Sequence, residues 1–249
     1  MTRFKAAGIH LGICALIAIV VLAVMLGVWY PGAYFQLMGG DKLLFLIIGV
    51  DVCLGPLATL VVFKSGKKGL KFDLTVIALI QAAALIYGTH VMFVARPAYT
   101  VFVINKFRVA AANDIEQTEL DKALRPEWQK IPLLGPQMVF GRWPAGKEGD
   151  DMTMLAMSGT DLHQFPKHYA PYSENVGEVL KQAKPLKTLL SLSPVHKERV
   201  ERFLRKHNRP EQDFVIVPIR SRDTFMTVVL DAKTGEYLEM LDVDPYPDS

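Results

Sequence analysis

The sequence predicts a membrane protein: three transmembrane α-helices followed by a soluble α+β domain with a mostly antiparallel sheet. Of the 249 residues, 51% are hydrophobic and 21% are charged, and the mean hydropathy is +0.22. Soluble domains carry about 25% charged residues. Three long apolar runs come before residue 95, and most of the charged residues follow it. We therefore divide the chain into a membrane domain, residues 1–95, and an outer domain, residues 96–249.

The predicted spans are residues 8–29, 43–63 and 74–94. They hold 21 or 22 residues each, and their only formal charge is Asp51. About 20 apolar residues cross the ~30 Å hydrocarbon core as a helix. The first run is longer than the ~7–15 residues of a signal-peptide core, and it ends in Trp29-Tyr30-Pro31 rather than at a cleavage site of small residues. We therefore expect an uncleaved anchor.

Basic residues predict the orientation of these spans. Arg3 and Lys5 come before the first span, and four lysines fill the connection between the second and third spans: Lys64, Lys67, Lys68 and Lys71. Positively charged loops stay in the cytoplasm. We therefore expect a cytoplasmic N-terminus and, in a bacterium, a multi-pass inner-membrane protein with a periplasmic outer domain. The same lysines favour contact with anionic membrane lipids. Four aromatic residues are expected to form a belt at the outer surface: Trp29, Tyr30, Tyr34 and Phe35.

Polar residues inside the spans are the candidate functional residues. A charge such as Asp51 at mid-membrane costs about 2.5–3.5 kcal/mol on insertion scales, so it should face another helix. By helix rise, Tyr87 on the third span lies at the best-matched depth, and Gln81 lies deeper. Three roles stay open for Asp51: a joint between helices, recognition of a partner, and ion transport.

Glycine and proline interrupt the second span at Gly55-Pro56. Pro56 lacks the N–H that an α-helix would pair with residue 52, so a kink is expected there, and a kink can open a groove in the outer half of the membrane. Small residues also recur four apart, at Gly8 and Gly12 and at Ala84 and Gly88. This spacing permits close helix packing, either within the chain or with a helix of another protein.

The outer domain shows alternating strand and helix signals. β-Branched and aromatic residues predict strands at 99–109 and 137–140, and helices are expected from residue 113 or 114 to 124, at 151–158 and at 175–183. Ser193-Pro194 is typical of a helix start and predicts a helix to Lys206. Strands at 214–219, 225–230 and 237–241, with turns at 221–223 and 231–235, predict an antiparallel meander.

The chain shows no pattern typical of catalysis or of cofactor binding. The nearest approach to a metal cluster is Asp161, His163 and His168, whose spacing fits neither one helix face nor one strand face, so ordinary solvated or hydrogen-bonded roles are expected. The two cysteines, Cys14 and Cys53, lie in apolar runs and exclude a disulfide scaffold. Residues 96–249 carry 21 basic and 22 acidic residues, which does not predict a nucleic-acid-binding face. We expect no enzymatic activity, cofactor or metal.

Several motifs together resemble those of the type IV pilin accessory family. They are Gly49-Val-Asp-Val-x-Leu-Gly-Pro-Leu-x-Thr-Leu60, Lys71-Phe-Asp-Leu-x-Val-Ile-Ala-Leu-Ile-Gln81, Ala95-Arg-Pro-x-Tyr99 and Phe165-Pro-x-x-Tyr-x-Pro-Tyr172. The resemblance covers most of the chain. It implies a non-enzymatic chaperone that binds and stabilises a pilin subunit in the inner membrane before pilus assembly. The alternatives are a membrane-anchored sensor with an external ligand-binding domain, and a membrane enzyme or transporter.

Overall fold

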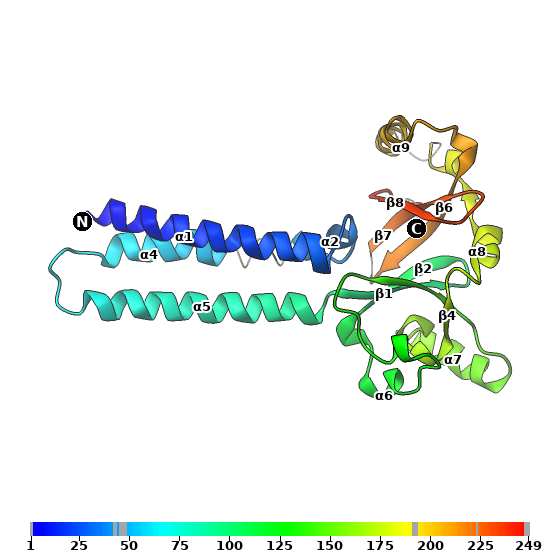
Figure 1. The fold of residues 1–249 in the computed structure, drawn as a ribbon, viewed down its shortest axis with the longest axis horizontal. Helices are drawn as coiled ribbons and strands as arrows, with labels where there is room; N and C mark the ends of the chain where they lie inside the picture. Colours follow the sequence, from blue (N-terminus) through cyan, green and yellow to red (C-terminus); the bar gives the residue numbers. More distant parts are fainter. Residues whose placement is uncertain (1, 42–43, 45–48, 191–193, 223, 247–249) are drawn as a thin grey trace.

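A bundle of helices projects from one end of an α/β domain (Figure 1). The computed structural model describes residues 2–41, 44, 49–190, 194–222 and 224–246, with side chains for all of these except 50, 51, 194 and 195. The bundle comes from the N-terminal part of the chain, and the α/β domain is formed mainly by residues 96–246.

Two helices in the described part of the chain are long and apolar enough to cross a membrane, Arg3–Trp29 and Leu70–Val94. The first consists of α1 (Arg3–Val24) and a π-helical turn, η1 (Met25–Trp29), and the second is α5 (Leu70–Val94). These helices end at the residues where the first and third predicted spans end.

The second predicted span is described only in part, because residues 42–43 and 45–48 lie outside the described residues. Its described portion is π-helical in η2 (Gly49–Leu54) and α-helical in α4 (Gly55–Val62). The change between the two helix types coincides with Gly55-Pro56, where the sequence predicts an interruption. The apolar helix here, Val52–Val62, is too short to cross a membrane alone, so a third span stays a prediction.

The described strands form one mixed sheet in the order β4-β3-β1-β2-β6-β7-β8, with β5 also paired to β6. Their bounds are β1 (Pro97–Val103), β2 (Lys106–Ala111), β3 (Gln137–Gly141), β4 (Tyr169–Pro171), β5 (Lys184–Pro185), β6 (Phe214–Ser221), β7 (Thr224–Asp231) and β8 (Tyr237–Leu241). The β6-β7-β8 meander is antiparallel as predicted. However, β1 pairs with β3 and β2 pairs with β6 in parallel, which no pattern in the sequence predicts.

The predicted strand 99–109 is wrong, because this stretch is a hairpin of β1 and β2. The chain reverses at Ile104, which has a φ of 58° and is 62% exposed. A β-branched residue in this left-handed conformation gives no turn signal in the sequence. The helix expected up to residue 124 is also shorter, because only the 3₁₀ turn η3 (Ala112–Asp114) and α6 (Gln117–Leu120) form.

The remaining helices lie around the sheet, and most of them bury side chains against one of its two faces. Their bounds are η4 (Pro126–Trp128), α7 (Lys147–Met157), η5 (Leu162–Gln164), η6 (Pro166–His168), α8 (Val176–Gln182), η7 (Leu186–Leu189), α9 (Pro194–His207) and η8 (Glu211–Asp213). Helix α9 matches its prediction to within one residue, although its expected cap, Ser193, lies outside the described residues. Because side chains alternate along a strand, Val101 faces the core beneath α6 and α7, and its neighbour Phe102 faces the opposite core with α8.

The connection after α1 is part of the core of the outer domain. In α2 (Tyr34–Leu37), both end residues join the cluster that contains Phe102. The Tyr34 hydroxyl lies 2.6 Å from Thr100 Oγ1 on β1, and the Tyr30 hydroxyl donates to the Met92 carbonyl oxygen at 2.8 Å. Two of the four aromatic residues expected in an interfacial belt, Tyr30 and Tyr34, are therefore buried against protein instead.

Candidate functional site

Two polar contacts and one close steric contact join the helices of the bundle to one another. His10 Nδ1 on α1 lies 2.6 Å from Thr59 Oγ1 on α4, and the Gln81 amide on α5 donates to Cys14 Sγ on α1 at 3.6 Å. A Cβ atom at Gly55 on α4 would overlap the Gln81 amide, so the backbone of α4 is in close contact with α5 there. Helix α4 thus packs against both α1 and α5. Hydrogen bonds of this kind between membrane helices average about 0.6 kcal/mol each, so close packing must supply much of the stability.

An apolar groove of about 190 Å³ lies between α1 and α5, and we call it the interhelical groove. Most of the side chains in its walls are small or branched and apolar. The polar groups among them belong to His10, Cys14 and Gln81. Its lining residues are His10, Ile13, Cys14, Ile17, Ala18 and Val21 from α1 and Ala78, Gln81, Ala82 and Leu85 from α5. A cavity of about 150 Å³ holds a benzene ring, so this groove has room for side chains of a neighbouring helix.

The interhelical groove continues toward the outer domain. A second hollow of about 380 Å³ shares Val21 and Leu85 with the first and reaches Trp29 and Phe93, whose rings lie 5.1 Å apart. From His10 to Trp29 the helix rises about 28 Å at 1.5 Å per residue. That length is close to the ~30 Å thickness of a bilayer core. The hollow therefore follows most of the predicted membrane thickness.

The structure brings together three of the five intramembrane residues that the sequence predicts. Gln81 lies against Gly55, which is next to Pro56, and both Gly55 and Pro56 are buried. Tyr87 is 72% exposed and, by its position along α5, lies on the side turned away from the groove. The side chain of Asp51 lies outside the described residues, so its expected pairing with Tyr87 stays a prediction.

Sequence reasoning missed His10 and Thr59 as partners and Cys14 as part of the groove. A signal for two of them was present, because His10 and Cys14 are four residues apart and therefore share one face of α1. Their partners on α4 and α5 could not be deduced in the same way, because nothing local specifies how three helices rotate against one another.

The small residues Gly8 and Gly12 on α1 have no close neighbour among the residues that the structure describes. A Cβ atom at Gly8 or Gly12 would meet no atom within 4 Å, so this face of α1 packs against nothing in the described part of the chain.

The predicted topology lysines lie at the end of the bundle far from the outer domain, in the connection between α4 and α5 and the first turn of α5 (Figure 1). One of them, Lys67, pairs with Asp73 at 2.6 Å.

In the outer domain, two of the three residues that most resembled a metal cluster are neighbours, since His163 Nδ1 lies 4.0 Å from Asp161 Oδ2, and His168 has a different partner. Burial and the nearby Arg108 guanidinium lower the pKa of His163 to about 4, an effect that Asp161 opposes, so this imidazole is neutral at pH 7. His168 lies 3.5 Å from Glu148, on another segment. No group of three or more His, Cys, Asp or Glu side chains in the described ranges is placed to hold a metal ion.

Comparisons with known proteins give the family. A family model described as "Fimbrial assembly protein FimB" matches residues 1–39. The chain is 34% identical to the fimbrial assembly protein of serogroup I of Dichelobacter nodosus over 233 residues, which cover 91% of this chain and 90% of the relative. The chain belongs to the fimbrial assembly protein family.

Other members of the fimbrial assembly protein family match different lengths of the chain. The serogroup E1 protein of Dichelobacter nodosus is 31% identical over 97% of this chain and 95% of its own. The protein of serogroups C1 and C2 is 38% identical over 48% of this chain and 92% of its own. No solved structure matches the chain. The FimB model itself covers α1, η1 and α2, so it spans one wall of the interhelical groove and the segment buried in the outer domain.

Gly55→Leu is expected to destabilise the bundle by about 1–3 kcal/mol, because the new side chain must displace the Gln81 amide and separate α4 from α5. The measurement is the midpoint of thermal unfolding of the purified full chain in detergent. Gly12→Leu is the matched control, because it adds the same side chain where a Cβ atom meets nothing. Equal midpoints for the two variants would contradict the close approach at Gly55.

Proposed function

We propose that this protein acts in fimbrial biogenesis as a non-enzymatic chaperone, binding a type IV pilin subunit in the bacterial inner membrane before assembly. The observation that carries the proposal is the interhelical groove, which is apolar, open and about as long as a membrane is thick. A pilin subunit awaiting assembly is an apolar helix anchored in the membrane with a globular head outside it. The names of the related fimbrial assembly proteins support a role in the same process.

The proposed arrangement places three spans in the membrane, with residues 43–63 as the second. The N-terminus and the four topology lysines lie on the cytoplasmic side, and the outer domain lies in the periplasm. Support comes from their positions, since Arg3 and the lysine connection share the end of the bundle opposite the outer domain (Figure 1). A subunit helix in the interhelical groove would then have its head on the same side as the outer domain.

The chemistry of the groove suits a helix better than a small polar ligand. Apolar burial drives little association inside lipid, because lipid tails are themselves apolar, so close packing and hydrogen bonds must supply the affinity. Ala18, Ala78 and Ala82 in the walls let a second backbone approach closely. The second ring nitrogen of His10, whose Nδ1 contacts Thr59, can form a hydrogen bond with a polar group on the incoming helix.

Photocrosslinking tests the proposal in cells that produce the full chain together with its pilin subunit. A photoreactive residue at Ile17 or Ala82 faces the groove, whereas one at Ile19 or Ile80 lies two residues away and about 200° around the same helix. We expect strong adducts with the subunit at the first two positions and weak ones at the controls. Equal yields at all four positions, or adducts at the controls alone, would contradict a groove-bound helix.

Filling the groove should also weaken capture of the subunit. Ala82→Trp is expected to reduce the amount of pilin that co-purifies with the full chain about tenfold, which corresponds to ~1.4 kcal/mol of binding free energy. The indole would occupy the space proposed for the client helix. Ile80→Trp adds the same ring on the opposite side of α5 and should leave co-purification unchanged.

A further inference from the structure

Two adjacent leucines on the outer domain are exposed without an evident structural role there. Leu133 is 61% exposed and Leu134 is 83% exposed. They lie in the stretch Ile131-Pro-Leu-Leu-Gly-Pro136, which carries no charged residue. We call residues 131–136 the leucine loop. Adjacent exposed leucines in an uncharged loop are typical of a surface that contacts another apolar phase.

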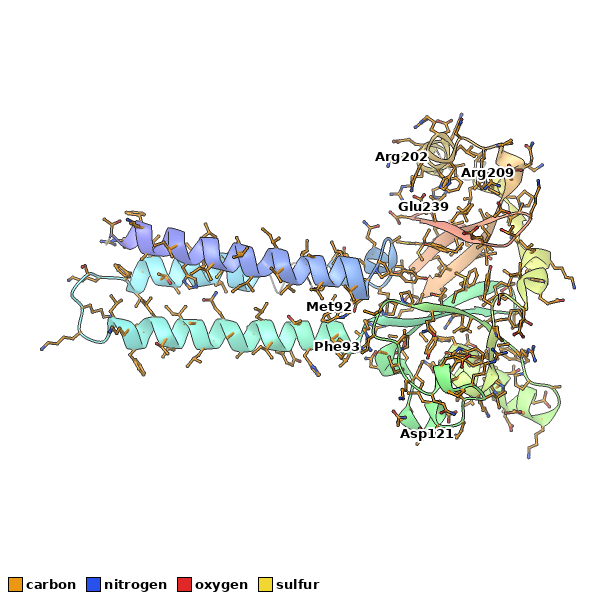
Figure 2. The ribbon with its side chains drawn as sticks, in the orientation of Figure 1. Met92, Phe93, Asp121, Arg202, Arg209 and Glu239 are labelled. Carbon is orange, nitrogen blue, oxygen red and sulfur yellow. The ribbon has the colours of Figure 1, made fainter. Side chains whose placement is uncertain are left out.

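Contacts hold the leucine loop against the ends of both long helices. The Arg96 guanidinium lies 4.0 Å from the centre of the Phe93 ring at the end of α5, and it donates to the Pro132 carbonyl oxygen at 3.1 Å. On the other side of the leucines, a Cβ atom at Gly135 would lie 3.5 Å from Pro31, which follows η1. The loop therefore lies at the end of both long helices that faces the outer domain. Figure 2 labels Met92 and Phe93 at this end of α5.

The register of the sheet places the loop at the same level independently. Strand β1 begins at Pro97, directly after α5, and β3 runs parallel to it with Gln137 beside Tyr99. The leucine loop comes directly before β3, so it lies at the end of β1 that follows α5. The β1–β2 turn at Ile104 lies at the other end of β1, about 20 Å farther on at ~3.3 Å per residue.

We propose that Leu133 and Leu134 insert into the outer leaflet of the membrane, at the boundary between headgroups and acyl chains, and so fix the height of the outer domain above the bilayer. The partner is lipid, because the loop meets the ends of the two apolar helices at the level of Trp29 and Phe93, and aromatic rings there are typical of the membrane interface. This inference rests on the membrane placement proposed above and is independent of pilin binding.

Spin labels on the full chain in vesicles of phosphatidylethanolamine and phosphatidylglycerol test the insertion. The background carries Cys14→Ala and Cys53→Ala, and single cysteines replace Leu133, Leu134, Ile104 or Leu79. Ile104 is the matched control, an exposed apolar residue at the far end of β1, and Leu79 is the reference within α5. Variants whose thermal unfolding matches that of the background enter the comparison.

We expect labels at 133 and 134 to collide with a water-soluble nickel chelate at least about threefold less often than the label at 104, as suits a depth of ~5–10 Å in the interface. The label at 79 should be shielded as well. Equal collision rates at 134 and 104 would overturn the insertion, and an accessible label at 79 would overturn the membrane placement too. Shielding at 134 that requires added pilin subunit would assign the leucines to a protein contact and also overturn the proposal.

Discussion

Residues 96–249 produced alone are expected to lose most of the stability that the outer domain has in the full chain. Tyr34 and Leu37, from the segment after α1, belong to the core of this domain and are 7% and 1% exposed. Truncating one buried leucine to alanine costs about 2–5 kcal/mol. Loss of both side chains would therefore remove an amount comparable with the ~5–15 kcal/mol that stabilises a typical domain.

Point substitutions in the full chain separate this effect from that of removing the membrane helices. Leu37→Ala should lower the free energy of unfolding of the outer domain by about 2–4 kcal/mol. Gln36→Ala, next to it on the exposed side of α2, should change it by less than about 0.5 kcal/mol. Thermal unfolding followed by near-ultraviolet circular dichroism measures the change in stability for both variants. A stable, cooperatively folded fragment 96–249, or equal effects at positions 36 and 37, would contradict the role of α2 as a core element.

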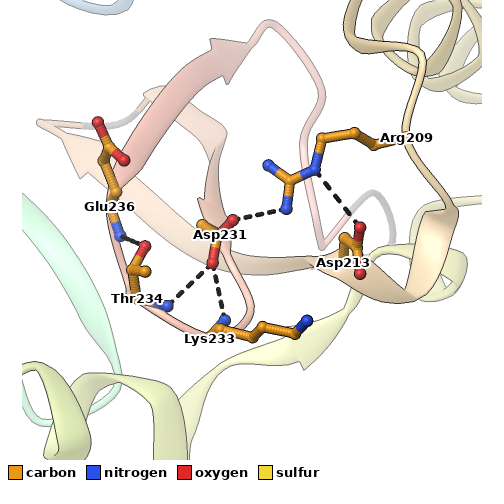
Figure 3. A network of polar contacts seen from close by, with 6 residues as sticks. All are labelled: Arg209, Asp213, Asp231, Lys233, Thr234 and Glu236. Carbon is orange, nitrogen blue, oxygen red and sulfur yellow. Dashed lines mark hydrogen bonds and ion pairs between the residues drawn. The ribbon is translucent and has the colours of Figure 1, made fainter.

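Asp231→Ala is expected to destabilise the outer domain by about 3 kcal/mol, because the carboxylate joins two segments of the chain (Figure 3). Its Oδ2 accepts from Arg209 Nη2 at 2.6 Å, and its Oδ1 accepts from the backbone N–H groups of Lys233 and Thr234 at 2.9 Å each. Arg209 also reaches Asp213, at 3.4 Å. The side chain thus ties the turn between β7 and β8 to the connection between α9 and β6.

The effect of Asp231 should depend on pH in a defined direction. Hydrogen bonds from the Thr234 backbone N–H and from Arg209 hold the pKa of Asp231 well below its usual range. A carboxyl group whose pKa is lower in the folded state stabilises the fold fully above its unfolded pKa of about 3.9, and this contribution is lost as the pH falls through the folded value. The difference between the natural chain and Asp231→Ala should therefore be constant from pH 5 to 7 and shrink below pH ~4.

Asp242→Ala is the matched control for this prediction. Asp242 pairs with Arg199 at the same 2.6 Å, but its side chain is half exposed, and exposed ion pairs contribute about 0–1 kcal/mol. Thermal unfolding of the two variants between pH 3 and 7 measures how much stability each one loses and whether that loss grows or shrinks as the pH falls. A difference for Asp231→Ala that grows on acidification would contradict the role assigned to this carboxylate.

The sequence by itself determined the features that depend on local properties. The first and third runs form helices that end at the predicted Trp29 and Val94, because the length of an apolar run is a local property. The β6-β7-β8 meander forms in the predicted order because turn residues and β-branched runs act over a few residues. Gln81 and Gly55 were also recognised from sequence, as a polar residue and a helix interruption inside apolar runs.

Only the tertiary structure decided which of these pieces meet. The two parallel strand pairs, β1 with β3 and β2 with β6, bring together segments that no local pattern links. The same holds for Tyr34 in the core of the outer domain and for Gln81 against Gly55 in the bundle. Such long-range contacts depend on how whole helices and strands rotate and pack. An apolar run alone does not specify whether its faces meet lipid, a neighbouring helix or an open groove. The interhelical groove could therefore be recognised only in the tertiary structure.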